Sequence, residues 1–177
     1  TLGIIGFGRI GQAVARRAKG FDMQILYYDV QRHPEAEATT GAKYMELPDL
    51  LQQSDFITLH TFLSPATHHL IGKEQFEQMK RSAILINTSR GPIVDSRALY
   101  WALSKNKIAA VAMDVTDPEP VQPDDPLLSL ENAIVTPHIA SASFKTRSLM
   151  ATMAAENLIA GLNGARLLNC VNPSVYD

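Results

Sequence analysis

The sequence predicts a protein of the α/β class, with a parallel β-sheet that carries helices on both faces. Short apolar runs alternate with amphipathic segments along the whole chain. The apolar runs are hydrophobic nearly throughout, which is typical of strands buried on both faces. Alternation of strands and helices builds parallel sheets, because each helix returns the chain to the same edge of the sheet.

Six apolar runs are expected to be strands, and a weaker seventh run lies at Ala42–Met45. The six are Leu2–Gly6, Gln24–Asp29, Asp55–His60, Ala83–Asn87, Ile108–Asp114 and Ala133–Thr136. The proline-rich stretch at 117–126 is expected to be a loop and not a domain linker. No internal repeat or low-complexity tract interrupts the pattern.

Three amphipathic segments between and after these runs are expected to be helices. In the first, Ile10, Ala13, Val14 and Ala18 fall on one face, and Gly20 is the expected C-terminal cap. In the second, Asp95 caps a helix that buries Leu99, Ala102 and Leu103. The third has the longest apolar stripe, formed by Ala151, Ala155, Leu158, Ile159 and Leu162, and it ends at Asn163-Gly164.

Length and composition predict one domain and exclude several classes of partner. A chain of 177 residues that is 46% hydrophobic can bury one well-packed core, so residues 1–177 are expected to form a single domain. A net charge of −2 favours neither nucleic acid nor an anionic membrane as a partner. The single cysteine, Cys170, fits a reducing compartment. No apolar run reaches the roughly 20 residues that span a bilayer, and no signal peptide is recognisable, so we expect a cytoplasmic protein.

A glycine-rich turn follows the first expected strand, in G-I-I-G-F-G-R-I-G. Its pattern is Gly6-x-Gly8-x-x-Gly11. Gly6 allows a tight turn, Gly8 lets a pyrophosphate approach the backbone, and Gly11 lets the helix pack on the strand. The first N–H groups of the helix are then offered to the phosphates. The pattern predicts a dinucleotide-binding turn in a Rossmann-type, doubly wound sheet, and a tight turn without a ligand is the alternative.

An acidic residue ends the second expected strand. Asp29 lies roughly 20 residues after the glycine turn, where a carboxylate accepts hydrogen bonds from the adenosine ribose hydroxyls. The same carboxylate repels a 2′-phosphate, which favours NAD over NADP. Arg32 stands close by and could meet a 2′-phosphate, so NADP stays open.

Three further loops follow strands, where parallel sheets build their sites. They are N-T-S-R-G-P (87–92), T-D-P-E-P (116–120) and T-P-H-I-A-S-A-S (136–143), and they supply Arg90, Glu119 and His138. Arginine offers a planar fork of donors to a carboxylate. Histidine transfers protons near neutral pH, and a neighbouring carboxylate favours its charged form. Taken alone, each residue is explained equally well by a structural or solvated role and by a catalytic one. Their joint placement after strands favours a catalytic site.

Five motifs in order along the chain resemble the D-isomer-specific 2-hydroxyacid dehydrogenase family, and within it the glyoxylate/hydroxypyruvate reductase branch. They are G-F-G-R-I-G, S-D-F-I-T-L-H, A-I-L-I-N-T-S-R-G-P-I-V-D, A-M-D-V-T-D-P-E-P and T-P-H-I-A-S-A-S. The resemblance covers the whole chain. It implies a NAD(P)-binding domain of an oxidoreductase that moves a hydride between a nicotinamide cofactor and a small D-2-hydroxy acid or 2-oxo acid, with no metal site.

The resemblance also implies a role for each site residue. Arg90 binds the carboxylate and carbonyl of the substrate, His138 donates and accepts the proton, and Glu119 pairs with His138. Asp114 is expected at the carboxamide end of the nicotinamide. The other expected cofactor contacts are Arg9 and Ile10 under the pyrophosphate, Thr61 near the adenosine, and Thr88, Ser89 and Ala140 on the nicotinamide side.

Departures from the family pattern define the alternatives. Phe62 stands where the family usually has proline, and Ala140 stands where it has glycine. A glutamate at 119 argues against the formate dehydrogenase branch. A nicotinamide-sensing corepressor would have a tryptophan where this chain has Ser141. Phosphoglycerate, lactate and other hydroxyacid dehydrogenases stay open.

The resemblance implies more than the present residues contain. Family members carry a second, substrate-binding domain and a long helix that forms a dimer. We therefore expect these residues to be the cofactor-binding half of a homodimeric enzyme, with the substrate-binding domain absent from them.

Overall fold

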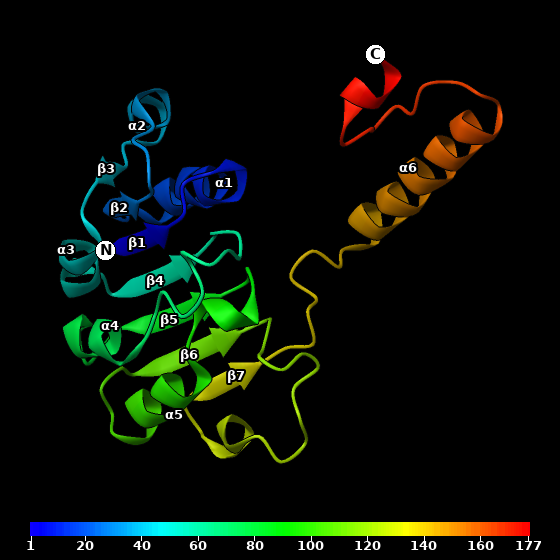
Figure 1. Ribbon diagram of the computed structural model, residues 1–177. Coiled ribbons are helices and arrows are strands. Elements are labelled where there is room, and N and C mark those ends of the chain that lie inside the picture. The colour runs from blue at the N-terminus through cyan, green and yellow to red at the C-terminus, as the bar shows by residue number, and fades with distance from the viewer. The chain divides into compact units, whose positions relative to one another are not determined.

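The computed structural model describes residues 1–177 and divides into two compact units, unit 1 (Thr1–His138) and unit 2 (Ile139–Asp177). Unit 1 contains one parallel sheet of seven strands in the order β3-β2-β1-β4-β5-β6-β7 (Figure 1). The strands are β1 (Leu2–Ile5), β2 (Ile25–Tyr28), β3 (Lys43–Tyr44), β4 (Phe56–Leu59), β5 (Ile84–Asn87), β6 (Ala110–Met113) and β7 (Ala133–Val135). The order reverses at β1, as in the doubly wound dinucleotide-binding fold. Every predicted strand is confirmed, within two residues at each end.

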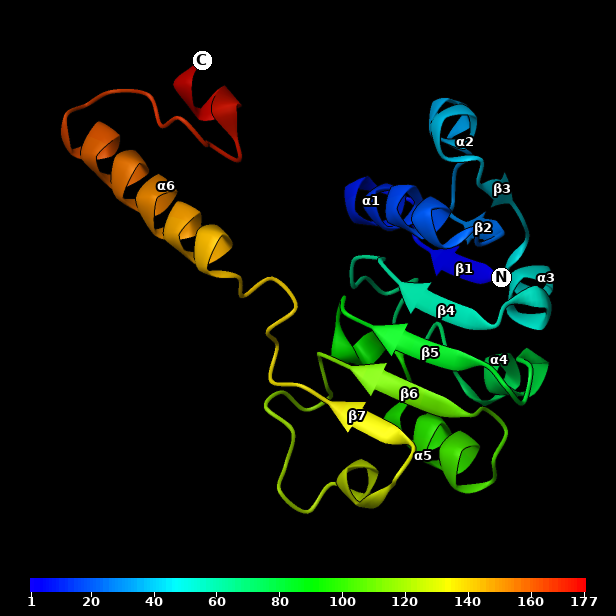
Figure 2. The same ribbon diagram turned by 180° about the vertical axis from the view of Figure 1, so that it is seen from behind.

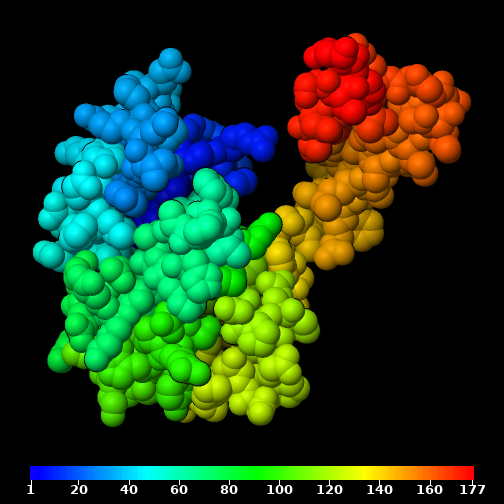
Figure 3. All heavy atoms as spheres, viewed as in Figure 1, coloured from blue at the N-terminus to red at the C-terminus, as the bar shows by residue number.

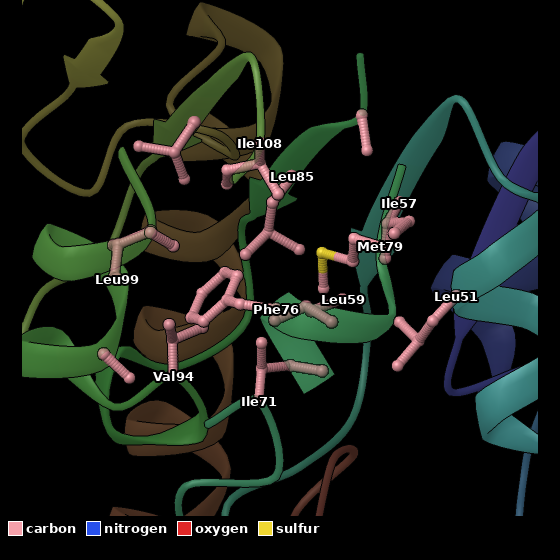
Figure 4. Packing of buried hydrophobic residues seen from close by; sticks show 14 of the residues in the cluster. Leu51, Ile57, Leu59, Ile71, Phe76, Met79, Leu85, Val94, Leu99 and Ile108 are labelled. Carbon is pink, nitrogen blue, oxygen red and sulfur yellow. The ribbon is translucent and has the colours of Figure 1, made fainter. Parts of the chain in front are cut away.

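One face of the sheet is covered by α3 (Leu47–Gln53), α4 (Lys73–Gln78) and α5 (Ser96–Ser104). The larger apolar cluster lies between these helices and the strands, and it contains the fully buried Phe76 and Leu85 (Figure 4). In the space-filling view, the cyan and green atoms of this part of the chain close over the strands (Figure 3). This cluster holds the strand ends that carry the site in fixed positions.

The prediction for α5 is confirmed in detail. The carboxylate Oδ1 of Asp95 accepts hydrogen bonds from the N–H groups of Arg97 and Ala98, at 2.9 and 3.0 Å. These two donors have no partner within the helix, so an aspartate that can accept their hydrogen bonds is favoured at this position. The three apolar residues assigned to the core, Leu99, Ala102 and Leu103, are buried.

The opposite face of the sheet is covered only in part, by α1 (Arg9–Ala18) and α2 (Pro34–Thr40). They pack over β1 and β2, where a second apolar cluster includes Ile4 and Tyr27. Over β4 to β7 the strands are open on this side (Figure 2). Phe56 is 40% exposed and Ile134 is 65% exposed. The expectation that all strands are buried on both faces is therefore wrong for this part of the sheet, because no helix of unit 1 packs there.

Two details predicted for α1 are wrong. Ile10 does not lie on the buried face: its side chain is 63% exposed, and the helix packs through Gly11, Ala15 and Ala18. In so short a helix the apolar residues allow two overlapping faces, and the close contact of Gly11 with the strand decides between them. Gly20 is not the C-terminal cap, because a 3₁₀ turn at Lys19–Phe21 continues the helix and Asp22 takes the left-handed conformation, with φ of 52°.

Unit 2 consists of the 19-residue helix α6 (Phe144–Leu162) and a tail that ends in a 3₁₀ turn at Pro173–Tyr176. The helix ends where the sequence predicts, since Asn163 is its cap and Gly164 has φ of +68°. Its apolar stripe is exposed, with Leu162 at 79%. None of the helices in the chain combines the length and the apolar character needed to cross a membrane.

Candidate cofactor-binding and catalytic site

The glycine turn joins β1 to α1 and has the geometry that its three glycines predict. Gly6 has φ of +89°, and a Cβ there would lie 2.7 Å from the backbone of His60 and Thr61. A Cβ at Gly11 would collide with the carbonyl oxygen of Gly6. Gly8 has open space around it and caps α1 without a side chain. Gly6 and Gly11 are therefore required by packing, and Gly8 leaves the start of the helix open to a ligand.

Asp29 follows β2 and is bonded directly to the glycine turn. Its Oδ2 accepts a hydrogen bond from the N–H of Phe7 at 2.6 Å, and its Oδ1 accepts one from the N–H of Val30 at 2.7 Å. The Nε2 of His33 lies 3.5 Å from Oδ2. The carboxylate thus has a fixed position beside the turn, where the sequence places the ribose contact.

A hollow of about 660 Å³ opens beyond the ends of β1, β4 and β5. It brings together six residues that the sequence assigns to the site: Arg9, Ile10, Thr61, Thr88, Ser89 and Arg90. His60, Phe62 and Leu63 complete its wall. The hydroxyl of Thr61 is buried there without a hydrogen-bond partner. A buried hydroxyl of this kind is uncommon and fits a site that receives a polar ligand.

A second hollow, of about 390 Å³, holds the expected proton-transfer pair. His138 Nδ1 lies 2.6 Å from Glu119 Oε1. The N–H of His138 donates to the carbonyl of Asp114 at 2.9 Å, and the Asp114 Oδ1 accepts from the hydroxyl of Thr136 at 2.6 Å. The prediction that Glu119 pairs with His138 agrees with this geometry, and Asp114 lies in the same hollow.

The two hollows lie beyond neighbouring strands. In the register of the sheet, Asn87 of β5 stands beside Met113 of β6, which stands beside Val135 of β7. The loops carrying Arg90, Glu119 and His138 therefore leave the sheet side by side (Figure 1). Arg90 lines the first hollow and the histidine–glutamate pair lines the second. Ala140 belongs to unit 2, so its expected contact with the nicotinamide stays a prediction.

A family model for the D-isomer-specific 2-hydroxyacid dehydrogenase NAD-binding domain matches residues 1–140. The chain belongs to this family. The match ends close to the boundary of unit 1, which contains the glycine turn and both hollows. The cofactor of this domain is NAD.

Two curated relatives and two solved structures show how much of such enzymes the chain represents. It is 57% identical over 175 residues to a glyoxylate reductase of Korarchaeum cryptofilum, covering 99% of this chain and 53% of the relative. It is 52% identical over 178 residues to glyoxylate/hydroxypyruvate reductase B of Escherichia coli, covering 100% of this chain and 55% of that relative. The TT0316 protein of Thermus thermophilus matches with a TM-score of 0.89 and 46% identity, and the match covers 96% of this chain and 53% of the TT0316 chain. A D-lactate dehydrogenase of Lactobacillus jensenii, solved with NAD⁺, matches with a TM-score of 0.86 and 37% identity. This match covers 96% of this chain and 55% of the dehydrogenase chain. The chain thus spans about half the length of these relatives.

The residues of unit 1 fit a nicotinamide dinucleotide. The N-terminus of α1 has no side-chain cap and carries the open Gly8, which suits a pyrophosphate. Asp29 is fixed beside this turn, where a contact with the ribose hydroxyls is predicted. The unpartnered hydroxyl of Thr61 lies in the adjoining hollow. Each of these features is a property of the chain itself and agrees with the family's cofactor.

Replacing Gly8 with alanine is expected to weaken NADH binding by at least tenfold without changing the thermal midpoint. The new methyl group meets no atom of the chain, so the fold is unaffected, and it occupies the side from which a pyrophosphate approaches. Calorimetric titration with NADH, together with thermal unfolding, measures both effects. Gly20→Ala is the matched control, because that glycine also lies in open space. Equal NADH affinity in the two variants would contradict this role of Gly8.

Asn87 is a site residue that the sequence analysis did not single out. Its buried Oδ1 accepts hydrogen bonds from the N–H and the hydroxyl of Ser89, at 3.0 and 2.8 Å. Its Nδ2 donates to the carbonyl of Arg90 at 2.9 Å. Asn87 therefore shapes the turn that carries Arg90 into the first hollow. An asparagine at the end of an otherwise apolar strand was the available signal.

His60 was also not predicted, and it makes the stability of unit 1 depend on pH. Burial lowers the pKa of its imidazole, whose Nε2 lies 3.0 Å from Thr58 Oγ1. The unfolded chain therefore binds the proton more readily than the folded chain. The stabilisation is fully present above the ordinary pKa of about 6.5 and is lost as pH falls through the lower, folded value.

We expect His60→Gln to lose less stability than the unmodified protein between about pH 7 and pH 5, because glutamine does not titrate. Urea unfolding at a series of pH values measures this slope. The two proteins are compared by how steeply the free energy of unfolding changes with pH. Its absolute value is not compared, because the substitution also changes the contact with Thr58. Parallel slopes in the two proteins would contradict the role of His60.

Proposed function

We propose that residues 1–177 are the dinucleotide-binding half of an enzyme that uses NADH to reduce a small 2-oxo acid to the D-2-hydroxy acid, with glyoxylate and hydroxypyruvate as substrates. The observation that carries this proposal is the 2.6 Å contact between His138 and Glu119 at the strand ends of a NAD-binding domain. The two relatives named for reduction of glyoxylate support the choice of substrate. The domain assignment extends the family match at 1–140 to include unit 2.

Three side chains supply the acid–base and electrostatic chemistry, and bound NADH supplies the hydride. Because Nδ1 of His138 is engaged by Glu119, its Nε2 holds the proton that passes to the substrate oxygen. The carboxylate of Glu119 stabilises the charged ring before the transfer. Arg90 uses one donor, Nη1, on the carbonyl of Ser89 at 2.6 Å, and its remaining donors suit a substrate carboxylate and a developing negative charge.

The wall of the second hollow favours this chemistry. Val121, Leu128 and Val135 line it together with the histidine–glutamate pair. The side chains of His138 and Glu119 are 48% and 39% exposed in the chain alone, and apolar walls strengthen the attraction between such groups once water is excluded from a closed cleft. In the oxidative direction, the neutral ring of His138 accepts the hydroxyl proton at the same nitrogen.

Assays of the complete protein with NADH and glyoxylate, hydroxypyruvate or pyruvate test the proposal. Oxidation of NADH, followed by its absorbance, is expected to be fastest with the first two acids. A clear preference for pyruvate would assign the enzyme to lactate chemistry. Absence of turnover with all three acids would contradict the proposed function.

The 177 residues alone are expected to bind NADH but not to reduce either acid. The glycine turn and Asp29 lie within unit 1. Catalysis also requires a closed cleft that fixes the reacting atoms, which contributes about 7–11 kcal/mol to lowering the barrier. The relatives are about twice as long, and we assign the other wall of the cleft to their additional residues. Calorimetry and a turnover assay on the same sample measure both properties, and efficient turnover would contradict the two-domain proposal.

The proposal also covers the setting of the enzyme. We infer a cytoplasmic homodimer that has no nucleic-acid or membrane partner. The net charge of −2 and the single cysteine support this inference, as does the resemblance to a family of dimeric enzymes. Light scattering on the complete protein measures the number of subunits.

A further inference from the structure

The connection between β2 and α2 contains two basic residues beside Asp29. Arg32 and His33 line a hollow of about 410 Å³ together with Gln12 of α1. Gln12 Nε2 donates to the carbonyl of Phe7 in the glycine turn at 2.8 Å. His33 lies 3.5 Å from the Asp29 carboxylate. This hollow therefore adjoins the place where the ribose of the cofactor is expected, and the state of Arg32 bears directly on a 2′-phosphate.

Arg32 is already engaged by a carboxylate of α2. Its Nη2 lies 2.7 Å from Glu37 Oε2, and its Nε lies 3.2 Å from Glu37 Oε1. These two nitrogens form the planar edge with which arginine binds a phosphate or carboxylate in a bidentate manner. The guanidinium carbon also lies 5.7 Å from the ring centre of Tyr44. One of the two planar edges with which Arg32 could bind a 2′-phosphate is thus occupied by Glu37, and its Nη2 is shared with the second edge.

Glu37 is itself fixed from the core. The hydroxyl of Tyr27 donates to its Oε1 at 2.6 Å, and the ring of Tyr27 is fully buried and stacks on Phe7 with 4.0 Å between centres. The hydrogen bonds from Arg32 and Tyr27 lower the pKa of the Glu37 carboxyl. Glu37 therefore stays ionised at neutral pH and is held in one position, unlike a freely moving surface carboxylate.

We propose that Glu37 is a specificity residue for the cofactor: it withholds Arg32 from the 2′-phosphate of NADPH and so supports the use of NADH. Binding of NADPH would require the pair to open and would place two negative charges, Asp29 and Glu37, near the added phosphate. NADH has hydroxyls at that ribose and meets neither cost. The inference rests on the NAD-binding role of unit 1 and is independent of the substrate.

Titration of the complete protein with NADPH and NADH, by calorimetry, tests the proposal. Glu37→Gln is expected to tighten NADPH binding about three- to tenfold, because it releases Arg32, while NADH affinity changes less than twofold. Glu35→Gln is the matched control. It removes a negative charge from the same hollow, and the structure shows no ion pair of Glu35 with Arg32. Its effect on NADPH binding is expected to be smaller.

Two further variants separate the release of Arg32 from a general change in charge or fold. In the double variant Arg32→Gln/Glu37→Gln, the gain in NADPH affinity is expected to disappear. Arg32→Gln alone is expected to leave NADPH affinity within twofold, because an arginine that is paired with Glu37 does not contribute to NADPH binding. The side chain of Arg32 is 61% exposed, so this substitution is not expected to unfold the protein.

Three results would overturn the proposal: an equal gain in Glu35→Gln and Glu37→Gln, a gain that persists without Arg32, or equal weakening of both cofactors in Glu37→Gln. The last result would assign Glu37 a purely structural role through Tyr27. Unmodified protein that bound neither cofactor would instead contradict the NAD-binding role, so the two failures are distinguishable.

Discussion

Replacing His138 with alanine in the complete enzyme is expected to lower turnover by about 10²–10⁴-fold, the usual contribution of a positioned acid–base group. Alanine has no group that can hold the proton destined for the substrate oxygen. Binding of NADH is expected to stay within a few-fold, since the glycine turn and Asp29 are untouched. Steady-state kinetics and NADH titration measure the two quantities. The exposed His68 offers a control, because His68→Ala removes an imidazole from another loop of unit 1.

The role of Glu119, the partner of His138, can be tested by a substitution of nearly the same shape. Glu119→Gln replaces the carboxylate that lies 2.6 Å from Nδ1 with a neutral amide. The ring of His138 loses the carboxylate that fixes its orientation and keeps Nε2 available to the substrate, so turnover is expected to fall by at least about tenfold while NADH binding stays within a few-fold. Equal turnover in Glu119→Gln and the unmodified enzyme would contradict this positioning role of Glu119. Unchanged turnover in His138→Ala would remove the proton-transfer role of the pair altogether.

The parts of the fold and site that could be predicted are those coded locally in the sequence. Each strand is a short apolar run, and the glycine pattern lies within six consecutive residues. The position of Asp29 follows from a fixed spacing along the chain. The pairing of Glu119 with His138 was implied by the family motifs, and it becomes physically understandable once β6 and β7 are neighbours.

The features that could not be predicted depend on contacts between distant segments. Ile10 is exposed because Gly11 packs against β1, and the spacing of apolar residues alone does not distinguish these two faces. The attachment of Arg32 to Glu37 depends on the hydroxyl of Tyr27, which the sequence shows only as an aromatic residue in a strand. The open face over β4 to β7 could be predicted only if it were known which strands α1 and α2 cover.

Gly91 is another residue whose importance emerges only from three dimensions. It follows Arg90 directly, begins a 3₁₀ turn at Gly91–Ile93 and is buried. A Cβ at this position would collide with the carbonyl of Thr116 and would lie 2.9 Å from the backbone nitrogen of Asp117. The loop after β5 therefore touches the loop after β6, and these are the loops that carry Arg90 and Glu119.

Gly91→Ala is expected to destabilise unit 1 by about 3 kcal/mol, because the added methyl group meets backbone and not a flexible side chain. For a chain of this size, that corresponds to a thermal midpoint lower by roughly 6–12 °C. The loops must separate to make room, so turnover of the complete enzyme is also expected to fall, since small displacements of reacting groups reduce rates strongly. Thermal unfolding and steady-state kinetics are measured beside Gly20→Ala, whose new methyl group meets no atom within 4 Å. If Gly91→Ala were as stable and as active as that control, the contact between the two loops would have no part in positioning Arg90 and Glu119.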